Sequence, residues 1–367
     1  MINILHVMSS ADQGGIASVV LNYYSHIDRT RFHFDVALTT DAFSYTGEKL
    51  TELGVRFYRL PLKSVDRKGY WDGLCRILRE NHYDAIHVHE NMTSFYALIA
   101  ARRCGVKIRI AHSHTSAPVH SIKEELARRL GCALNSIFAT ELLACGELAG
   151  RRVFGSLAMK TKKGHVLPNA VDPEQFRFRE TDRESIRARN DDEKSFVIGL
   201  VGRLEEEKNP MFALQIVREA MKTIPEIRLY IVGYGSLEER IRQQIAEDGL
   251  DEHVLCLGRQ KNVGPLYSSF DALIMPSLHE GYPVAAVEAV ANGLPVLLSD
   301  RITRELKEFE GISYLPLTNC DKWVEKLREI RNTGARSLGA ESFQGSKMDI
   351  KCSAHILECI YSGKEER

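Results

Sequence analysis

The chain has 367 residues, a length that suits two domains with separate hydrophobic cores. Lys and Arg together number 49, as do Asp and Glu, so the net charge is zero and excludes a general affinity for nucleic acid. The eight cysteines show no C-x-x-C spacing, which argues against a disulfide framework and favours a reducing cytoplasm. Neither a signal peptide nor an apolar run of membrane-spanning length is recognisable. We therefore expect a cytoplasmic protein.

Strands and helices are predicted to alternate along the first half of the chain. A strand at residues 2–8 leads through Gly14 and Gly15 into a helix, so that the glycines let the backbone approach a ligand or form a plain tight turn. Further strands are expected at 34–39, 55–58, 84–89, 107–111, 142–145 and 166–171. This alternation predicts a parallel sheet with helices on both faces.

Histidines lie at the ends of two of these strands: His87, His89, His112 and His114. The carboxyl ends of parallel strands meet at one edge of a sheet, which is where ligands bind in this architecture. One interpretation is a zinc site, although neither a cysteine nor a carboxylate follows at ligand spacing. The alternative is a set of polar strand ends that hydrogen-bond to loops.

Residues 121–163 form a basic amphipathic region, in which cations lie among Leu126, Leu130 and Leu134. The cations are Lys123, Arg128, Arg129, Arg151, Arg152, Lys160, Lys162 and Lys163. One interpretation is a solvated helix face. The other is peripheral contact with the anionic inner face of a membrane, where each basic residue contributes about 1 kcal/mol.

Charged residues dominate 177–194, which is the best candidate for a linker between domains. Within it, the acidic run 191–193 is predicted to be a solvated turn. The second half of the chain again alternates, so it predicts another doubly wound domain. Its strands are expected at 196–201, 228–232, 254–257, 271–275 and 296–298, and later helices at 323–330 and 348–361.

The strand ends of this second domain carry groups that suit a sugar joined to a diphosphate. Arg203 and Lys208 would bind phosphate oxygens, together with the helix N-terminus that follows Glu280. Carboxylates accept hydrogen bonds from sugar hydroxyls, so Glu288 could bind a ribose and Glu280 a hexose. Each glutamate could equally be a solvated residue at a helix start. No D-x-D motif occurs, so a divalent metal is not indicated.

Several motifs recur together in known enzymes: Val201-Gly-Arg-Leu204 with Lys208-Asn209, Val232-Gly-Tyr-Gly235, Pro276-Ser277, Glu280-Gly-Tyr-Pro283 with Glu288-Ala289, Gly14-Gly15 and Leu167-Pro-Asn-Ala-Val-Asp172. In this combination the chain resembles the retaining glycosyltransferases of family 4. The histidine segment at 111–115 and the segment at 299–303 look most like the bacterial exopolysaccharide and capsule branch.

The resemblance implies the GT-B fold, an α/β fold with two Rossmann-like, doubly wound domains that face each other across a cleft. The first, 1–176, would bind the acceptor, and the second, 177–344, the nucleotide-sugar. Residues 345–367 would pack back on the first domain. The family also implies transfer of a sugar with retention of configuration and without a metal or other cofactor.

The resemblance further assigns roles to individual residues. Arg203 and Lys208 would stabilise the departing diphosphate, Glu280 would orient the sugar, and His114 would be the active-site histidine, with His112 as the competing assignment. Other donor-binding positions would be Gly14, Gly15, Gly202, Gly233, Arg259, Val263, Gly281, Tyr282, Pro283 and Glu288. His112 and His89 would lie on the acceptor side.

One departure concerns the segment after Asp300, where the family has a Gly-Gly turn and an acidic residue. Here the sequence is Arg-Ile-Thr-Arg-Glu (301–305), in which Thr303 could serve instead. We expect a hexosyltransferase that uses a UDP-sugar, or else a GDP-sugar, and a glycan or polyprenyl-linked acceptor. The alternatives are a nucleotide-sugar epimerase of the same fold and a non-catalytic nucleotide-sugar-binding protein.

Overall fold

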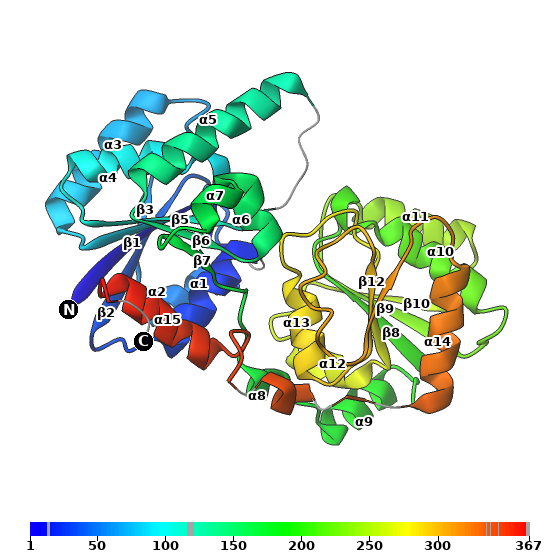
Figure 1. Ribbon diagram of the computed structural model, residues 1–367. Coiled ribbons are helices and arrows are strands. Elements are labelled where there is room, and N and C mark those ends of the chain that lie inside the picture. The colour runs from blue at the N-terminus through cyan, green and yellow to red at the C-terminus, as the bar shows by residue number, and fades with distance from the viewer. Residues whose placement is uncertain (13–14, 116–120, 335, 338, 344, 365–367) are drawn as a thin grey trace. The chain divides into compact units, whose positions relative to one another are not determined.

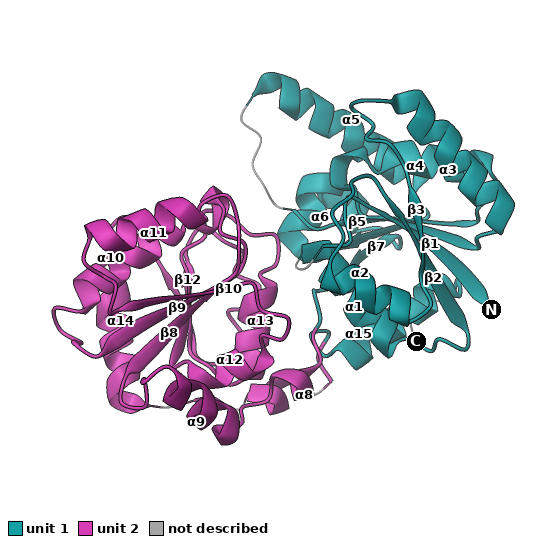
Figure 2. Ribbon diagram, turned by 180° about the vertical axis from the view of Figure 1, so that it is seen from behind, with its two compact units in different colours: residues 1–170, 347–367 teal, residues 171–346 magenta. Residues whose placement is uncertain are grey.

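The computed structural model describes residues 1–12, 15–115, 121–334, 336–337, 339–343 and 345–364. They form two compact units (Figure 2). Unit 1 comprises residues 1–170 and 347–367, and unit 2 comprises residues 171–346. Residues 171–176, which the sequence places in the first domain, therefore belong to unit 2.

Unit 1 is built on a seven-stranded parallel sheet in the order β3-β2-β1-β4-β5-β6-β7 (Figure 1). The strands are β1 (Ile2–Met8), β2 (Phe32–Leu38), β3 (Arg56–Arg59), β4 (Ala85–Val88), β5 (Ile108–Ser113), β6 (Glu141–Ala144) and β7 (Gly164–Val166). The strand order reverses between β1 and β4. In open α/β sheets, ligands bind at the carboxyl ends of the strands beside such a switch point.

The helices of unit 1 are α1 (Gly15–His26), α2 (Tyr45–Glu52), α3 (Arg67–Asn81), α4 (Phe95–Arg103), α5 (Ile122–Phe138), α6 (Glu147–Phe154), α7 (Ser156–Met159), α15 (Ile350–Tyr361) and the 3-10 turn η1 (Asn91–Thr93). The last helix, α15, packs beside α1 although the two lie at opposite ends of the sequence (Figure 1). Its Ile350, Ala354, Leu357 and Tyr361 share one helix face and are all buried in the same core.

Unit 2 contains a six-stranded parallel sheet in the order β10-β9-β8-β11-β12-β13. The strands are β8 (Phe196–Val201), β9 (Ile227–Val232), β10 (Val254–Gly258), β11 (Ala272–Met275), β12 (Val296–Ser299) and β13 (Ile312–Leu315). Here the strand order reverses between β8 and β11. The sequence did not predict β13, because all its residues are only half-buried and it lacks the apolar run of the central strands.

The helices of unit 2 are α8 (Pro173–Phe176), α9 (Glu180–Arg189), α10 (Pro210–Ala220), α11 (Glu238–Glu247), α12 (Gly264–Ser269), α13 (Val284–Ala291), α14 (Asp321–Thr333) and the 3-10 turns η2 (Glu206–Lys208) and η3 (Gly339–Phe343). In α10, α11 and α14, apolar side chains on one face join the core against the sheet. Among the described residues, no helix is both long and apolar enough to cross a membrane.

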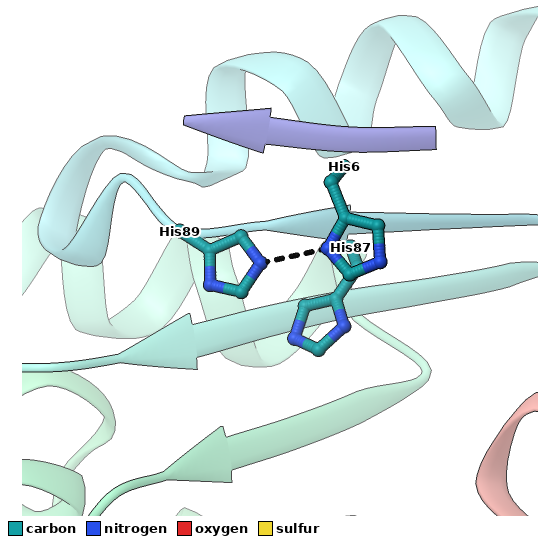
Figure 3. A group of neighbouring side chains, drawn as sticks. All are labelled: His6, His87 and His89. Atoms are coloured by element: carbon teal, nitrogen blue, oxygen red, sulfur yellow. Dashed lines mark hydrogen bonds between the residues drawn. The ribbon is translucent and has the colours of Figure 1, made fainter. Parts of the chain in front are cut away.

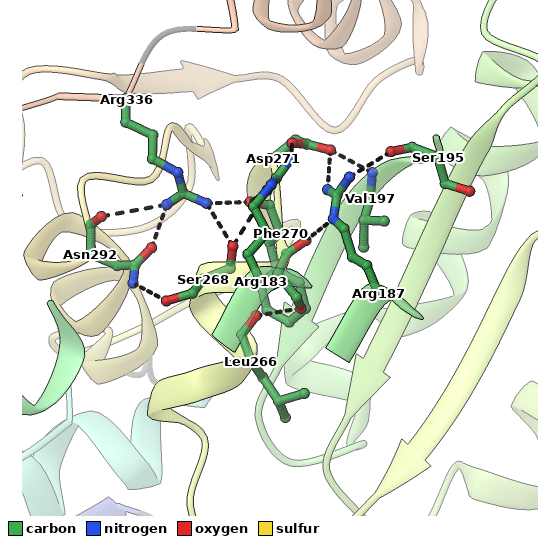
Figure 4. Close-up of polar contacts among 11 residues, drawn as sticks. Arg183, Arg187, Ser195, Val197, Leu266, Ser268, Phe270, Asp271, Asn292 and Arg336 are labelled. Carbon is green, nitrogen blue, oxygen red and sulfur yellow. Dashed lines mark hydrogen bonds and ion pairs between the residues drawn. The ribbon is translucent and has the colours of Figure 1, made fainter. Parts of the chain in front are cut away.

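The linker predicted at residues 177–194 is wrong, because most of that segment is anchored inside unit 2 (Figure 4). Two arginines of α9, Arg183 and Arg187, each approach a carboxylate oxygen of Asp271 to 2.6 Å. Asp271 also accepts a 2.8 Å hydrogen bond from the backbone of Val197. The charged residues of this segment therefore include a partly buried ionic cluster. The composition of the segment alone had suggested charges exposed to solvent.

The acidic run 191–193 also differs from the prediction of a solvated turn. Asp192 is buried, lies 2.9 Å from the guanidinium of Arg228 and accepts a hydrogen bond of 2.5 Å from the hydroxyl of Tyr230. The alternating side-chain pattern of β9 places both partners at this position. Asp192 thus links the turn before β8 to the neighbouring strand β9.

Candidate active site

Two glycines bring the ends of β8 and β9 together, beside the switch point of unit 2 between β8 and β11. A Cβ atom on Gly233 would lie 1.8 Å from the carbonyl oxygen of Gly202, so only glycine permits this approach. Both residues have a φ of 150°, in the range that L-residues rarely adopt. The two backbones therefore form a close-packed wall at the carboxyl edge of the sheet.

A small pocket lies against this wall. It is lined by Leu200, Val201, Gly202, Arg203, Leu204, Lys208, Met275 and Ser277. The residues come from the ends of β8 and β11, on either side of the switch point. The sequence prediction that Arg203 and Lys208 lie at a common edge of the sheet therefore agrees with their positions.

Lys208 and Glu280 contact each other directly. The ammonium nitrogen of Lys208 lies 2.5 Å from Oε1 of Glu280, and the hydroxyl of Ser277 donates a hydrogen bond of 2.9 Å to the same oxygen. The side chains of Lys208 and Glu280 are 22% and 11% exposed, so the pair is screened from bulk water but remains reachable. Such a pair offers a cation to a phosphate and a carboxylate to a sugar hydroxyl in adjacent positions.

Arg203 lies further out. Its side chain is 58% exposed, and its guanidinium donates to Oε1 of Glu207 at 2.7 Å. The loop that carries Glu207 is tied to the β11 loop, because the carbonyl of Glu207 accepts from the backbone N–H of Leu278 at 2.8 Å. The two cations of this edge, Arg203 and Lys208, are thus each paired with a carboxylate of the same unit.

Glu288 of α13 contacts Tyr267 of α12, whose hydroxyl donates a hydrogen bond of 2.6 Å to Oε2. Burial raises the pKa of Glu288 to about 7, and the hydrogen bond from Tyr267 lowers it by less. This carboxyl group therefore changes charge near neutral pH. A partly buried carboxyl group that accepts from one hydroxyl retains acceptor capacity for a ligand hydroxyl.

The other positions of unit 2 that the resemblance assigns to donor binding follow β10 or lie at the starts of α12 and α13. The guanidinium of Arg259, just after β10, lies 4.6 Å from the ring centroid of Tyr234. Val263 caps α12, the helix that carries Tyr267, and the segment 281–283 leads into α13. Their expected roles as donor-binding residues stay predictions.

Thr303 is less suited to the role that the sequence suggested. It is buried, its hydroxyl donates to Oε1 of Glu305 at 3.0 Å, and its carbonyl accepts from the hydroxyl of Tyr314 at 3.0 Å. These contacts use Thr303 to close the turn after β12. A phosphate contact would require the hydroxyl to leave Glu305.

In unit 1 the histidines do gather at the carboxyl edge of the sheet, on a single face of β4 and β5. His89 and His112 are buried, whereas His114 is partly exposed. The expected acceptor-side roles of His89 and His112 do not fit this burial, because neither ring reaches the surface. Of the two candidates for the active-site histidine, His114 is therefore the accessible one. Gly14 lies outside the described residues, and Gly15 begins α1 with a φ of 57°.

Comparisons with known proteins match both units separately. Residues 14–170 match the family described as glycosyl transferase 4-like domain, and residues 181–310 match glycosyl transferases group 1. EpsF of Bacillus subtilis (strain 168), assigned as a glycosyltransferase, is 33% identical over 339 residues, which cover 90% of this chain and 88% of EpsF. The chain belongs to the glycosyltransferases.

A second relative of this glycosyltransferase is the UDP-Gal:alpha-D-GlcNAc-diphosphoundecaprenol alpha-1,3-galactosyltransferase of Escherichia coli. It is 30% identical over 274 residues, which cover 70% of this chain and 68% of that enzyme. Among solved structures, Anabaena Alr3699/HepE in complex with UDP and glucose superposes with a TM-score of 0.80 at 19% identity, over 99% of this chain and 100% of HepE. The fold is thus the GT-B fold of two Rossmann-like domains.

Several residues that hold the candidate site residues in place had no role predicted from the sequence. Ser277 and Tyr267 donate hydrogen bonds to the two glutamates, and Glu207 accepts one from Arg203. Ser277 was part of the Pro276-Ser277 motif, but its contact with Glu280 was not predicted. His6, which lies on the same face as the other histidines, could have been found from the strand alignment, because it pairs in register with His87.

Proposed function

We propose that this glycosyltransferase moves a hexosyl group from a UDP-sugar to a glycan or polyprenyl-linked acceptor during synthesis of a surface polysaccharide. The contact of Lys208, Glu280 and Ser277 at the switch point of unit 2 is the observation that carries the proposal. The Escherichia coli relative, whose name gives UDP-Gal as donor and a diphosphoundecaprenol-linked acceptor, supports the substrate class. HepE, whose complexes contain UDP and glucose, supports the nucleotide.

In the proposed reaction, the bond between the anomeric carbon and the diphosphate oxygen breaks, and a bond to an acceptor hydroxyl oxygen forms. Negative charge develops on the departing diphosphate, and the acceptor's proton leaves with it. Lys208 and Arg203 stabilise that charge where it develops, which is where electrostatic help is effective. Glu280 accepts from sugar hydroxyls and Glu288 from the ribose. With two cations on the diphosphate, transfer needs no divalent metal, and we propose that configuration is retained.

The direct test measures UDP release from UDP-glucose, UDP-galactose and UDP-N-acetylglucosamine with a polyprenyl-diphosphate-linked sugar, in the presence and absence of EDTA. We expect release that depends on the acceptor, survives EDTA and gives a product with the donor's anomeric configuration by NMR. An epimerase would convert the donor without any acceptor. A non-catalytic binding protein would show a thermal shift with UDP and release none. Either outcome would replace this proposal.

We also propose that α5 of unit 1 rests on an anionic membrane surface, such as the inner face where a lipid-linked acceptor is exposed. Three apolar side chains, Ile122, Leu126 and Leu130, follow one another at helical spacing and are 83%, 62% and 60% exposed. Each would contribute about 1.5–3 kcal/mol on full burial. Arg129 is largely exposed on the same helix, although it pairs with Glu125.

The basic contribution is smaller than the sequence suggests. Arg128 is only 17% exposed, binds Glu125 and donates to the carbonyl of Arg152 at 3.0 Å, so it is not available to lipid. Vesicle co-sedimentation tests the surface. The double variant L126D/L130D should lose binding to vesicles that contain phosphatidylglycerol, whereas V65D, which changes an apolar residue that is 81% exposed outside α5, should keep it. Equal loss in both variants would contradict the assignment to α5.

A further inference from the structure

The histidines of unit 1 form a hydrogen-bonded chain that begins at His114. Its Nε2 lies 2.8 Å from Nδ1 of His89, and Nε2 of His89 lies 3.0 Å from Nδ1 of His6 (Figure 3). Nε2 of His6 in turn lies 3.4 Å from the hydroxyl of Tyr361, which α15 inserts into the core. The chain therefore joins the partly exposed edge of the sheet to the buried helix that covers it.

The chain continues past Tyr361 through a second pair of histidines. The Tyr361 hydroxyl lies 2.7 Å from Nδ1 of His87, and Nε2 of His87 lies 3.0 Å from Nδ1 of His112. It ends there, because Nε2 of His112 is buried and has no hydrogen-bond partner among the described residues. One end of the chain is thus closed, and the other is the partly exposed His114.

The distances between the ring nitrogens are those of hydrogen bonds, 2.8 Å for His89 and His114 and 3.0 Å for both His6 with His89 and His87 with His112. The planes of the paired rings are nearly parallel, with interplanar angles of 13° for His6 and His89, 20° for His87 and His112, and 30° for His89 and His114. Two groups of three histidines, His6, His87 and His89 and then His89, His112 and His114, have ligand nitrogens within 4.8 Å of one another and could hold a metal ion, so zinc binding is the competing outcome of the test below.

The number of protons restricts the states of this chain. A neutral imidazole has one N–H and one bare nitrogen, and the Tyr361 hydroxyl also supplies one proton. Six neutral groups therefore bring six protons to five hydrogen bonds, and the sixth proton must lie at one end. A buried N–H without an acceptor is rare in proteins, so Nε2 of His112 is the end that stays bare. The sixth proton then lies on Nδ1 of His114.

We propose that this hydrogen-bonded chain holds His114 neutral, with its N–H at Nδ1, so that His114 meets a substrate as a neutral hydrogen-bond donor instead of a cation. His89 and His6 are the positioning residues. To protonate His114, every proton in the chain must shift by one position and leave His112 with a buried, unpaired N–H. The inference rests on the proposed function for the part that His114 plays in transfer, but the state of its ring can be measured without activity.

The surroundings of the chain agree with this state. Burial is the leading cause that lowers the pKa of each of the five histidines, and it lowers the pKa of His114 to about 3. Among the described residues, the charges that lower these pKa values further are those of the histidines themselves. Tyr23 of α1, which faces Tyr361, has a pKa that burial raises well above its ordinary value, so it is neutral at neutral pH. The causes that lower the pKa values of the five histidines include no charge from a described carboxylate.

The test uses the full-length protein labelled with 15N-histidine. The chemical shifts of the ring nitrogens identify the tautomer of each histidine. We expect His114 to be neutral with Nδ1 protonated and not to titrate between about pH 5 and 8. In His89→Gln the side-chain amide can either donate or accept, so the hydrogen-bonded chain is interrupted and the pKa of His114 should rise from about 3 into the range of about 5–8. His6→Gln interrupts it one step deeper and should act in the same direction if His89→Gln fails to fold. His165→Gln, on β7 and outside the chain, is the matched control.

The pH profile of kcat/KM should follow the spectra. In His89→Gln it should gain an acid limb in the range of about pH 5–8, which wild type and His165→Gln lack. Three results would each overturn the proposal. They are titration of wild-type His114 near its ordinary pKa, a His114 tautomer with the N–H on Nε2 and a bare Nδ1, and stoichiometric zinc bound by these rings. A protein with the expected spectra but no transfer with any donor would overturn the proposed function and leave the chain intact.

Discussion

Replacing Glu288 by Gln should stabilise the protein at pH 8 while it weakens binding of the donor. Burial raises the pKa of Glu288 to about 7, from an ordinary value of 4.5. Between those pH values the folded protein holds a proton that the unfolded chain has released. Glu288 therefore contributes stability that is full below pH 4.5 and is lost as the pH rises through 7. A glutamine is neutral at every pH and avoids that loss.

The magnitude follows from the difference between the two pKa values. At about 1.36 kcal/mol for each of the 2.5 pH units between 4.5 and 7, the ionised carboxylate costs about 3 kcal/mol at pH 8. The amide can still accept from Tyr267, but its NH2 group needs a new partner, which offsets about 1 kcal/mol. We expect a net gain of about 2 kcal/mol, or a rise in the melting temperature of unit 2 of roughly 4–8 °C.

The assay is a series of thermal melts between about pH 5 and 8.5, analysed as the difference between variant and wild type at each pH. This difference removes the contribution of the histidines in unit 1, which is common to both proteins. It should be large at pH 8 and vanish toward pH 5, and Glu239→Gln, at an exposed position of α11, should show no such trend. Calorimetry should show UDP bound at least about tenfold more weakly by the variant. A destabilised variant at pH 8, or unchanged UDP affinity, would refute the reasoning.

Two further substitutions test the edge of unit 2. Lys208→Ala removes the cation beside Glu280 and should lower turnover about a hundredfold or more with fold intact by circular dichroism; near-normal turnover would remove Lys208 from the diphosphate site. Gly233→Ala should destabilise unit 2 far more than Gly249→Ala, as measured by urea unfolding. Both glycines have positive φ, but only Gly233 packs against another backbone, so equal losses would contradict close packing as the cause.

The fold was predictable because its signals are local and repeated. Buried parallel strands such as β8 and β11 are short apolar runs, and the helices between them carry apolar residues at helical spacing. Segment 177–194 was not predictable in this way. Arg183 and Arg187 form ion pairs with Asp271, which lies more than 80 residues later in the sequence. The composition of a segment cannot distinguish a cation that faces water from one that pairs with a carboxylate remote in the sequence.

The same distinction applies to the site. Motif spacing was sufficient to bring Lys208 and Glu280 to one edge of the sheet, because both follow strands that flank the switch point. It could not reveal Tyr267, which reaches Glu288 from the preceding helix, nor the raised pKa that results from burial. Nor could it show that His89 and His112 point into the core, because strand alternation gives the face of the sheet and not the depth of a side chain.

The cations at the carboxyl edge of the unit 2 sheet already have carboxylate partners before any substrate binds. In unit 2 the cations are already paired, Lys208 with Glu280 and Arg203 with Glu207, so each gains a phosphate oxygen only by loosening a carboxylate contact. Under the proposed function, part of the binding energy for the diphosphate would therefore be spent on releasing Glu280, which would then accept hydrogen bonds from the sugar while Lys208 contacts the phosphate. Binding of UDP alone should be weaker than binding of the whole UDP-sugar, because only the sugar supplies hydroxyl donors to the released carboxylate.

In Glu280→Gln, where Lys208 has lost the carboxylate of Glu280, the preference for UDP-sugar over UDP should shrink and UDP itself should bind more tightly. Competition calorimetry measures both quantities, and tighter binding of the UDP-sugar alone would show that Glu280 does not restrain Lys208.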